Sequence, residues 1–273
     1  IMDGLVGSEM CIRDSTYRLK FILRQIMRYF IGNWKMFGVP KSINILNKIN
    51  YFHSKDKNRQ KYKVVITPPY TLIETYAKYF KNKRISIGSQ NCYQKDQFSS
   101  NTAAVSPFMI KSVGAKYTLI GHSDNRSEGD TNEMLKNKVF FALKNNLKVV
   151  FCIGENKTQK KNKKTFSVLK KQLTNVLDKK FNKNNIIVAY EPIWSIGTGK
   201  IPTKNELKKT TIYIKQVLKN IFRKKSPAVL YGGSVDESNV EMFKEIREID
   251  GFLIGGASKS SKKFIDIIKN YYR

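Results

Sequence analysis

The chain has 273 residues, enough for one large domain or two small ones with a sizeable core. No apolar run approaches the roughly 20 residues that a membrane-spanning helix needs, so we expect no membrane partner. Its 51 Lys and Arg residues outnumber the 21 Asp and Glu residues, giving a formal net charge of +30. Its three cysteines show neither a metal-ligand spacing nor a disulfide framework, which is typical of a reducing cytoplasm.

The positive charge alone would suggest a nucleic-acid or anionic-membrane partner. The basic residues are scattered along the whole chain, however, and the densest runs, residues 55–63 and 160–164, do not interleave aromatics in the manner of a groove for single strands. Frequent Lys, Asn and Ile are what a coding bias toward A and T produces. We therefore expect solvated lysine faces and no specific nucleic-acid partner, although a positive field would speed encounters with an anionic substrate.

Residues 1–26 fit neither the repeat described below nor a signal peptide, because their apolar run, residues 21–23, is short and no cleavage site follows it. The segment 8–15, S-E-M-C-I-R-D-S, resembles translated sequencing-adapter read-through. We interpret residues 1–26 as a non-native, loosely attached extension. The domain is expected to span residues 27–273, starting at Met27.

From Met27 onward, short apolar runs alternate with longer segments of helical periodicity. Near-continuous apolarity without strict alternation is typical of strands buried on both faces, as in a parallel sheet covered by helices. The predicted strands are residues 29–31, 64–66, 85–87, 117–120, 149–151, 186–188, 228–230 and 252–254.

Apolar stripes at helical spacing lie between these runs, and one of them follows the capping-box spacing of Thr203 and Glu206. Eight alternations predict an α/β fold, a single closed (β/α)8 barrel with eight parallel strands and outer helices. A doubly wound open sheet is the alternative, but no G-x-G-x-x-G follows the first strand. The stripes are Leu135, Val139, Phe140 and Leu143; Phe166, Leu169, Leu173, Val176 and Leu177; and Leu207, Ile214, Leu218 and Ile221.

In such a barrel the active site lies at the carboxyl ends of the strands. Asn33 and Lys35 follow the first strand in G-N-W-K-M, His122 follows the fourth in G-H-S, and Glu191 follows the sixth. Three strand ends thus bring a cation, an imidazole and a carboxylate to one mouth.

A rigid, hinged flap over Glu191 is predicted in the segment Y-E-P-I-W-S-I-G-T-G-K. Pro192 stiffens its start, Trp194 is a large apolar anchor, and the glycines tolerate large φ/ψ changes. A surface loop that merely contains these residue types is the alternative. The predicted lid consists of Pro192, Ile193, Trp194, Ser195, Ile196, Gly197, Thr198, Gly199 and Lys200.

These motifs, over the length from Met27, resemble the triosephosphate isomerase family, which is itself the reference case for a Glu base paired with a neutral His. The resemblance implies a TIM barrel that interconverts dihydroxyacetone phosphate and D-glyceraldehyde 3-phosphate through an enediol(ate), in glycolysis and gluconeogenesis. It also implies a cytoplasmic homodimer that needs no metal and no cofactor.

The resemblance assigns the catalytic roles by position. Glu191 is the base, and neutral His122 donates a hydrogen bond to the carbonyl oxygen. Asn33 adds a second hydrogen bond and Lys35 a fixed positive charge, with Asp124 beside it. A buried, merely structural His122 is the alternative.

Glycine pairs follow the seventh and eighth strands, in Y-G-G-S and G-G-A-S, where this barrel class binds phosphate with backbone N–H groups. Glycine pairs alone are weak evidence, because tight turns use them everywhere. Their order after these two strands strengthens the prediction. The expected substrate and phosphate contacts are Asn33, Lys35, Gly197, Ser234, Gly255 and Gly256.

The chain departs from the family after His122-Ser123, where Asp124 and Asn125 replace the usual Glu and Arg. Because the Asp124 side chain is shorter than that of Glu, the sequence does not decide whether it contacts Lys35. A catalytic group misplaced by ~1 Å can cost ~10²-fold in rate. We therefore predict an active enzyme that is slower if the contact fails.

The second departure concerns the loop after the third strand, where the family has a Thr-Gly-Glu that enters the neighbouring subunit. Here its acid is Ala104, while the arginine that this acid meets is Asn125. Losing both partners leaves no unpaired charge. A homodimer is expected to persist through Thr102 and apolar contacts.

Two residues are expected to have no catalytic role. His53 lies among Ser54, Lys55 and Asp56, which favours an exposed side chain, and Cys152 in F-C-I-G-E matches a buried support residue of the family. Two other functions stay open. One is a different phosphate-binding barrel enzyme, and the other is a nucleic-acid-binding or catalytically retired barrel, suggested by the charge and Asp124.

Overall fold

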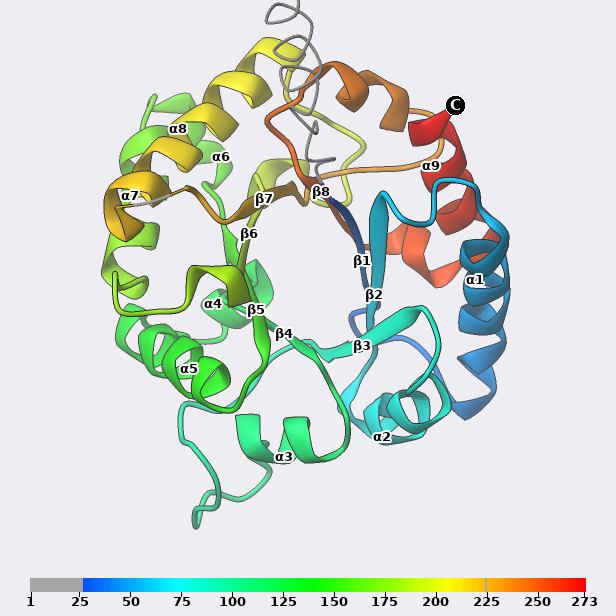
Figure 1. Ribbon diagram of the computed structural model, residues 1–273. Helices are drawn as coiled ribbons and strands as arrows, with labels where there is room; N and C mark the ends of the chain where they lie inside the picture. Colours follow the sequence, from blue (N-terminus) through cyan, green and yellow to red (C-terminus); the bar gives the residue numbers. More distant parts are fainter. Residues whose placement is uncertain (1–26, 224) are drawn as a thin grey trace, which may run out of the picture.

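The computed structural model describes residues 27–223 and 225–273, so the expectation for residues 1–26 lies outside the described residues. Eight parallel strands follow one another around a closed barrel, as Figure 1 shows, and β1 pairs with both β2 and β8. Each predicted strand lies within one observed strand, which confirms the predicted barrel. The strands are β1 Arg28–Asn33, β2 Tyr62–Thr67, β3 Ile85–Ser89, β4 Tyr117–Ile120, β5 Lys148–Ile153, β6 Ile186–Tyr190, β7 Ala228–Tyr231 and β8 Gly251–Ile254.

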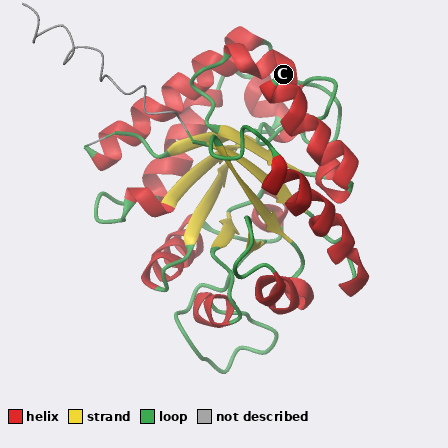
Figure 2. Cartoon of the chain, turned by 45° about the vertical axis from the view of Figure 1, so that its right-hand side comes forward, coloured by secondary structure: helices red, strands yellow, loops and turns green. Residues whose placement is uncertain are grey.

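Helices cover the outside of the barrel, and Figure 2 shows the strands gathered within them. The α-helices are α1 Ile43–Lys55, α2 Tyr70–Tyr79, α3 Pro107–Ser112, α4 Ser123–Ser127, α5 Asn132–Lys144, α6 Lys157–Lys161, α7 Thr165–Val176, α8 Lys204–Phe222 and α9 Ser261–Tyr272. Short 3-10 turns are η1 Pro40–Ser42, η2 Lys183–Asn185, η3 Ile193–Ser195, η4 Val240–Glu245 and η5 Gly256–Lys259.

The three predicted helical stripes fall on α5, α7 and α8. Helix α8 opens with the predicted capping box, in which Thr203 Oγ1 accepts the Glu206 N–H at 3.2 Å and Glu206 Oε2 accepts the Thr203 N–H at 2.9 Å. Two residues of the predicted stripes do not lie in the core: Phe140 and Phe166 are 48% and 43% exposed. They lie at the edge of the stripe, where Phe166 stacks on Tyr213 instead of entering the core.

Side chains alternate between the inside of the barrel and the layer beneath the helices. Along β6, Ile187 and Ala189 belong to the interior cluster while Ile186 and Val188 pack outward. Glu191 has the inward parity, so the backbone aims it at the carboxyl-end mouth. The interior cluster consists of Ile31, Val65, Tyr117, Leu119, Val150, Cys152, Ile187, Ala189, Leu230 and Leu253.

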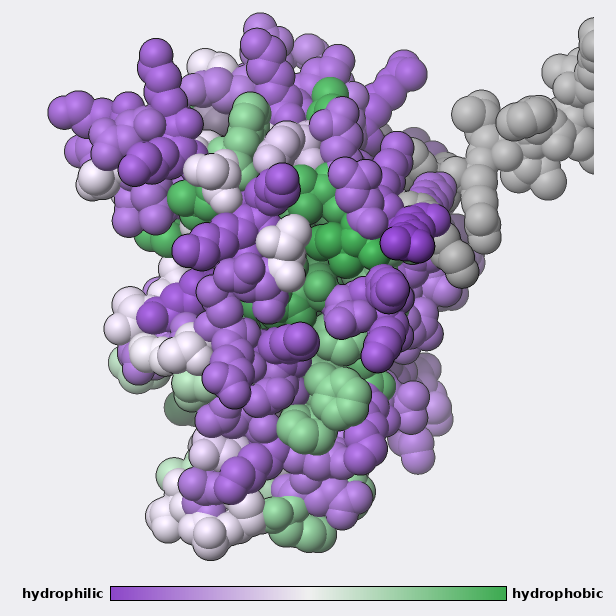
Figure 3. Space-filling view, turned by 90° about the vertical axis from the view of Figure 1, so that its left-hand side faces the viewer, coloured by the Kyte–Doolittle hydropathy of each residue, from purple (hydrophilic) through white to green (hydrophobic). Residues whose placement is uncertain are grey.

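The surface is largely hydrophilic. Figure 3 shows mainly hydrophilic residues on the face that carries α5, α7 and α8, with apolar side chains between them. Such a surface agrees with the expectation of solvated lysine faces. Among the described residues, no helix combines the length and the apolarity needed to span a membrane.

The prediction of an exposed His53 is wrong. His53 lies on the inner face of α1, only 3% exposed, with its ring stacked on Tyr62 at a centroid distance of 4.7 Å. Burial, the largest influence, lowers the pKa of this imidazole. Its polar sequence neighbours face solvent, but the helical period turns position 53 toward β2, and local composition does not report that direction.

Candidate active site

A cavity of about 690 Å³ opens at the carboxyl ends of the strands. Residues that the sequence predicted from β1, β4 and β6 line it together: Asn33, Lys35, His122 and Glu191. The predicted phosphate contacts Gly197, Ser234, Gly255 and Gly256 line the same cavity. Widely separated parts of the chain therefore converge on one site.

Glu191 is held tightly at the end of β6. It is 4% exposed, and its backbone N–H donates to the Ile153 carbonyl at 2.7 Å. A Cβ added at Gly154 would lie 1.8 Å from the Glu191 carbonyl oxygen, so only glycine fits beside this backbone. Burial raises the pKa of the Glu191 carboxyl, and the nearby His122 and Lys35 partly oppose that shift. The carboxylate is thus a stronger base than an exposed Glu.

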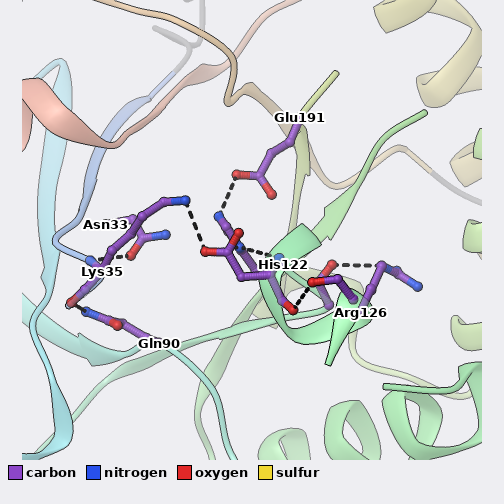
Figure 4. A network of polar contacts seen from close by, with 9 residues as sticks. Asn33, Lys35, Gln90, His122, Arg126 and Glu191 are labelled. Carbon is purple, nitrogen blue, oxygen red and sulfur yellow. Dashed lines mark hydrogen bonds and ion pairs between the residues drawn. The ribbon is translucent and has the colours of Figure 1, made fainter. Parts of the chain in front are cut away.

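His122 faces Glu191 from the start of α4. Its Nδ1 accepts the Asp124 N–H at 3.1 Å, which leaves Nε2 to carry the proton of a neutral imidazole. Figure 4 shows this ring directed at Glu191, with Nε2 3.5 Å from Oε1. The imidazole is 5% exposed and lines the cavity, so its donor is available to a substrate oxygen there.

Lys35 adopts a left-handed backbone conformation, with φ of 54°, which is strained for a side-chain-bearing residue. Hydrogen bonds hold it in place. Its N–H donates to Asn33 Oδ1 at 3.0 Å, and Gln90 Nε2 donates to its carbonyl at 2.8 Å and to that of Thr67 at 2.9 Å. This network fixes the direction in which the ammonium enters the cavity (Figure 4).

The shorter carboxylate of Asp124 does reach Lys35. Its Oδ2 lies 3.1 Å from Lys35 Nζ, which answers the question that the sequence left open. The Asp124 side chain is 59% exposed, so the pair is solvated rather than buried.

The phosphate end of the cavity is open, and two lysines and Asp236 line it. A Cβ added at Gly255 or Gly256 would meet no atom within 4 Å, so free space lies in front of this backbone, where η5 begins. Lys259 and Lys263 also line the cavity, and the sequence reasoning missed both. Open backbone N–H groups and flanking ammonium groups suit a phosphate dianion.

The predicted lid leaves β6 through η3 and is docked on the loop after β7. The Ser234 hydroxyl donates to the Ser195 carbonyl at 2.7 Å and accepts the Gly199 N–H at 3.3 Å. Gly197 and Gly199 have φ of 68° and 72°, the left-handed region that favours glycine. Ile196, Gly197 and Gly199 face the cavity, so the docked lid forms one of its walls.

Comparisons with known proteins match nearly the whole chain to one protein family. The family model described as triosephosphate isomerase matches residues 28–271. The triosephosphate isomerase of Saccharomyces cerevisiae is 36% identical over 248 residues, covering 89% of this chain and 98% of the relative. That of Thermodesulfovibrio yellowstonii is 33% identical over 245 residues, with the same coverage.

The chain belongs to the triosephosphate isomerase family. A crystal structure of triosephosphate isomerase from Bartonella henselae superimposes with a TM-score of 0.82 at 30% identity, covering 90% of this chain and 99% of that one. The alternative of a different phosphate-binding barrel family is therefore wrong.

Three polar residues that support this triosephosphate isomerase site escaped the sequence reasoning. Gln90 holds the Lys35 carbonyl, and Glu155 Oε1 accepts the indole N–H of Trp194 at 2.9 Å. Arg126 donates to the Gly121 carbonyl at 2.8 Å and to that of Cys152 at 3.1 Å, tying β4 to β5. Gln90 and Glu155 lie just after β3 and β5, so reading every strand end would have found them.

Neither Cys152 nor Thr102 lines the cavity. Cys152 is 1% exposed in the barrel interior, and burial raises the pKa of its thiol, which agrees with a support role. Thr102 is exposed on the loop between β3 and α3 and does not line the cavity.

Proposed function

We propose that this chain interconverts dihydroxyacetone phosphate and D-glyceraldehyde 3-phosphate, in glycolysis and gluconeogenesis, with Glu191 as the base that moves the proton. The observation that carries the proposal is the pairing of the buried Glu191 carboxylate with His122 Nε2 at 3.5 Å, inside a cavity that also contains Lys35.

In the proposed reaction, Glu191 removes a proton from the carbon next to the carbonyl and returns it to the neighbouring carbon. Negative charge then develops on the carbonyl oxygen. His122 Nε2–H donates to that oxygen, since its Nδ1 is already occupied by the Asp124 N–H. The Nε2 proton then passes to that oxygen, and the imidazole takes back the proton of the neighbouring hydroxyl, so that the carbonyl and hydroxyl groups exchange places. Asn33 adds a second donor, and the ammonium of Lys35 stabilises the enediolate. Protons move only between carboxylate, imidazole and substrate, so these steps use no metal and no redox cofactor.

The phosphate group would occupy the open side of the cavity. Ser234, Gly255 and Gly256 line this side, where the backbone N–H groups of the two glycines would bind the phosphate, and Gly197 of the lid would supply another. The docked lid excludes water, which strengthens the electrostatic contacts and protects the enediolate from losing phosphate.

We also propose a cytoplasmic homodimer. Met36, directly after Lys35, is 99% exposed, and Phe98 on the loop that carries Thr102 is 76% exposed. Large apolar side chains left in water beside a catalytic residue favour an interface that covers them. Thr102 and these contacts would replace the missing charge pair of Ala104 and Asn125.

A coupled assay of triose-phosphate isomerisation tests the catalytic proposal. Glu191→Gln should lower kcat on the order of 10²–10⁴-fold, the usual contribution of a general base. Glu133→Gln, which removes an exposed carboxylate on α5, is the matched control and should keep full activity. Equal rates for the wild type and Glu191→Gln would remove the proposed mechanism, and an inactive wild type would indicate a catalytically retired barrel.

A further inference from the structure

A second cavity, of about 610 Å³, opens at the other end of the barrel. Tyr62, Tyr117 and Lys148, the first residues of β2, β4 and β5, contribute to its wall, so it lies at the amino ends of parallel strands. The active-site cavity lies at the carboxyl ends, and the two walls share no residue. We refer to this second cavity as the floor cavity.

The wall of the floor cavity is strongly basic. Within residues 27–223 and 225–273, none of its cationic side chains forms an ion pair with a carboxylate. A concave surface of one charge sign focuses its field and concentrates counter-ions. The principal cations are Arg59, Lys63, Arg84, Lys111, Lys116 and Lys148.

Two of these lysines point toward the barrel axis. Lys63 and Lys148 have the same parity along β2 and β5 as Val65 and Val150, which belong to the interior cluster. Burial and the charge of Lys63 lower the pKa of Lys148. Like charges therefore converge where an anion would relieve their repulsion.

The same wall contains buried polar atoms that form no hydrogen bond of ordinary geometry with the described part of the chain. His53 is 3% exposed, and its Nδ1 and Nε2 form no hydrogen bond of ordinary geometry within the described residues, although the Arg59 backbone lies close enough to oppose the lowering of its pKa. The buried Nε of Arg59 has none there either. Leaving such groups unpaired is costly, and an acceptor-rich occupant would pair with their N–H donors. Asp56, the acid whose charge acts on His53, already accepts the Tyr62 hydroxyl at 2.6 Å.

We propose that the floor cavity is a binding site for a small polyphosphate anion, a molecule carrying at least two linked phosphate groups. A single phosphate would leave part of this wall uncompensated, because its cations are spread over the amino ends of four strands, β2 to β5. A small anion is favoured over a nucleic acid strand, since the cations line a pocket instead of following an extended groove with stacking aromatics.

Isothermal titration calorimetry of the full chain with inorganic triphosphate, at about 0.15 M salt, tests this proposal. The wild type should bind saturably. The double variant Lys63→Gln/Lys148→Gln should bind at least ~10-fold more weakly, because a hydrogen bond to a charged group is worth roughly one tenfold step in affinity. The control Lys170→Gln/Lys171→Gln removes the same charge from the exposed face of α7 and should bind like the wild type.

The outcomes separate a local site from a general charge effect. Equally weakened binding in both double variants would show that the overall charge of the protein attracts the anion. Unchanged affinity in Lys63→Gln/Lys148→Gln would show that triphosphate binds elsewhere, for example in the active site. Either result overturns the proposal, as does the absence of binding by the wild type. If the first variant folds poorly by circular dichroism, Arg84→Gln/Lys116→Gln, on exposed positions of the same wall, provides the same test.

Discussion

Gly232 is packed against the side chain of Glu191: a Cβ atom at position 232 would lie 2.7 Å from Glu191 Cγ. The glycine pair after β7, which its sequence context marks as part of a phosphate site, therefore has a second role. Its first member leaves the space that the carboxylate occupies. The loop after β7 therefore contacts the base by packing, and its Ser234 holds the lid by hydrogen bonds.

Gly232→Ala is expected to displace the Glu191 carboxylate, because the added methyl group would overlap it. A shift of about 1 Å in a catalytic group can cost ~10²-fold in rate, so kcat should fall by that order. Steady-state kinetics combined with thermal unfolding would check this. A variant with an unchanged kcat would mean that Glu191 does not depend on this contact.

The buried position of Glu191 predicts the pH dependence of the reaction. Because burial raises its pKa above the ordinary 4.5, the acid limb of kcat/KM should lie above that value. Lys35 lowers the same pKa, so Lys35→Gln should move the limb to still higher pH. A pH–rate profile of both proteins measures the shift, and a limb that moves to lower pH would contradict the assignment.

A raised folded-state pKa also makes stability pH-dependent. The folded chain binds the Glu191 proton more tightly than the unfolded chain, so this carboxyl favours folding at low pH and loses that contribution as pH rises through its folded pKa. At pH 7, Glu191→Gln should therefore melt at a higher temperature than the wild type, and the difference should shrink on acidification. Calorimetric scans at two pH values provide the comparison.

The contact between Asp124 and Lys35 is solvated, with side chains 59% and 34% exposed. Such pairs contribute about 0.2–1 kcal/mol, so Asp124→Asn should lower kcat/KM by no more than about fivefold. Since the shorter carboxylate already reaches Lys35, Asp124→Glu should change the rate little. A large gain in Asp124→Glu would instead show that the natural Asp handicaps the enzyme.

Ser195 is expected to hold the lid in its docked position. It is fully buried, and its Oγ lies 3.1 Å from the Tyr231 hydroxyl and 3.4 Å from the Ser234 backbone N. Ser195→Ala should lower kcat/KM by ~3–10-fold, the worth of a lost hydrogen bond, and raise the fraction of substrate that loses phosphate. Ser167→Ala, on the exposed face of α7, serves as the control. An unchanged elimination ratio would argue for a purely structural role.

Sedimentation tests the proposed homodimer. The wild type should sediment as a dimer at micromolar concentration, and Met36→Lys should shift it toward monomer, because an almost fully exposed Met would become a charge inside the interface. Lys170→Gln, a charge change on the exposed face of α7, is a suitable comparison. Monomer alone in the wild type would end the dimer proposal.

The sequence by itself determined the barrel and the set of groups at its mouth. Buried parallel strands leave continuous apolar runs, and their carboxyl ends must meet at one rim, so Lys35, His122 and Glu191 could be brought together without coordinates. The apolar runs and the residues that follow them can both be read from short stretches of sequence, because they depend on the hydrophobic pattern and on the position relative to a strand end.

Only the tertiary structure decided contacts between distant segments. The reach of Asp124 to Lys35, the packing of Gly232 on Glu191 and the burial of His53 against Tyr62 each depend on side-chain directions from two elements. The floor cavity belongs to the same class, since Lys63 and Lys148 are 85 positions apart and neighbours only across a closed barrel. Chain composition records how many charges there are, whereas packing decides which of them face one another.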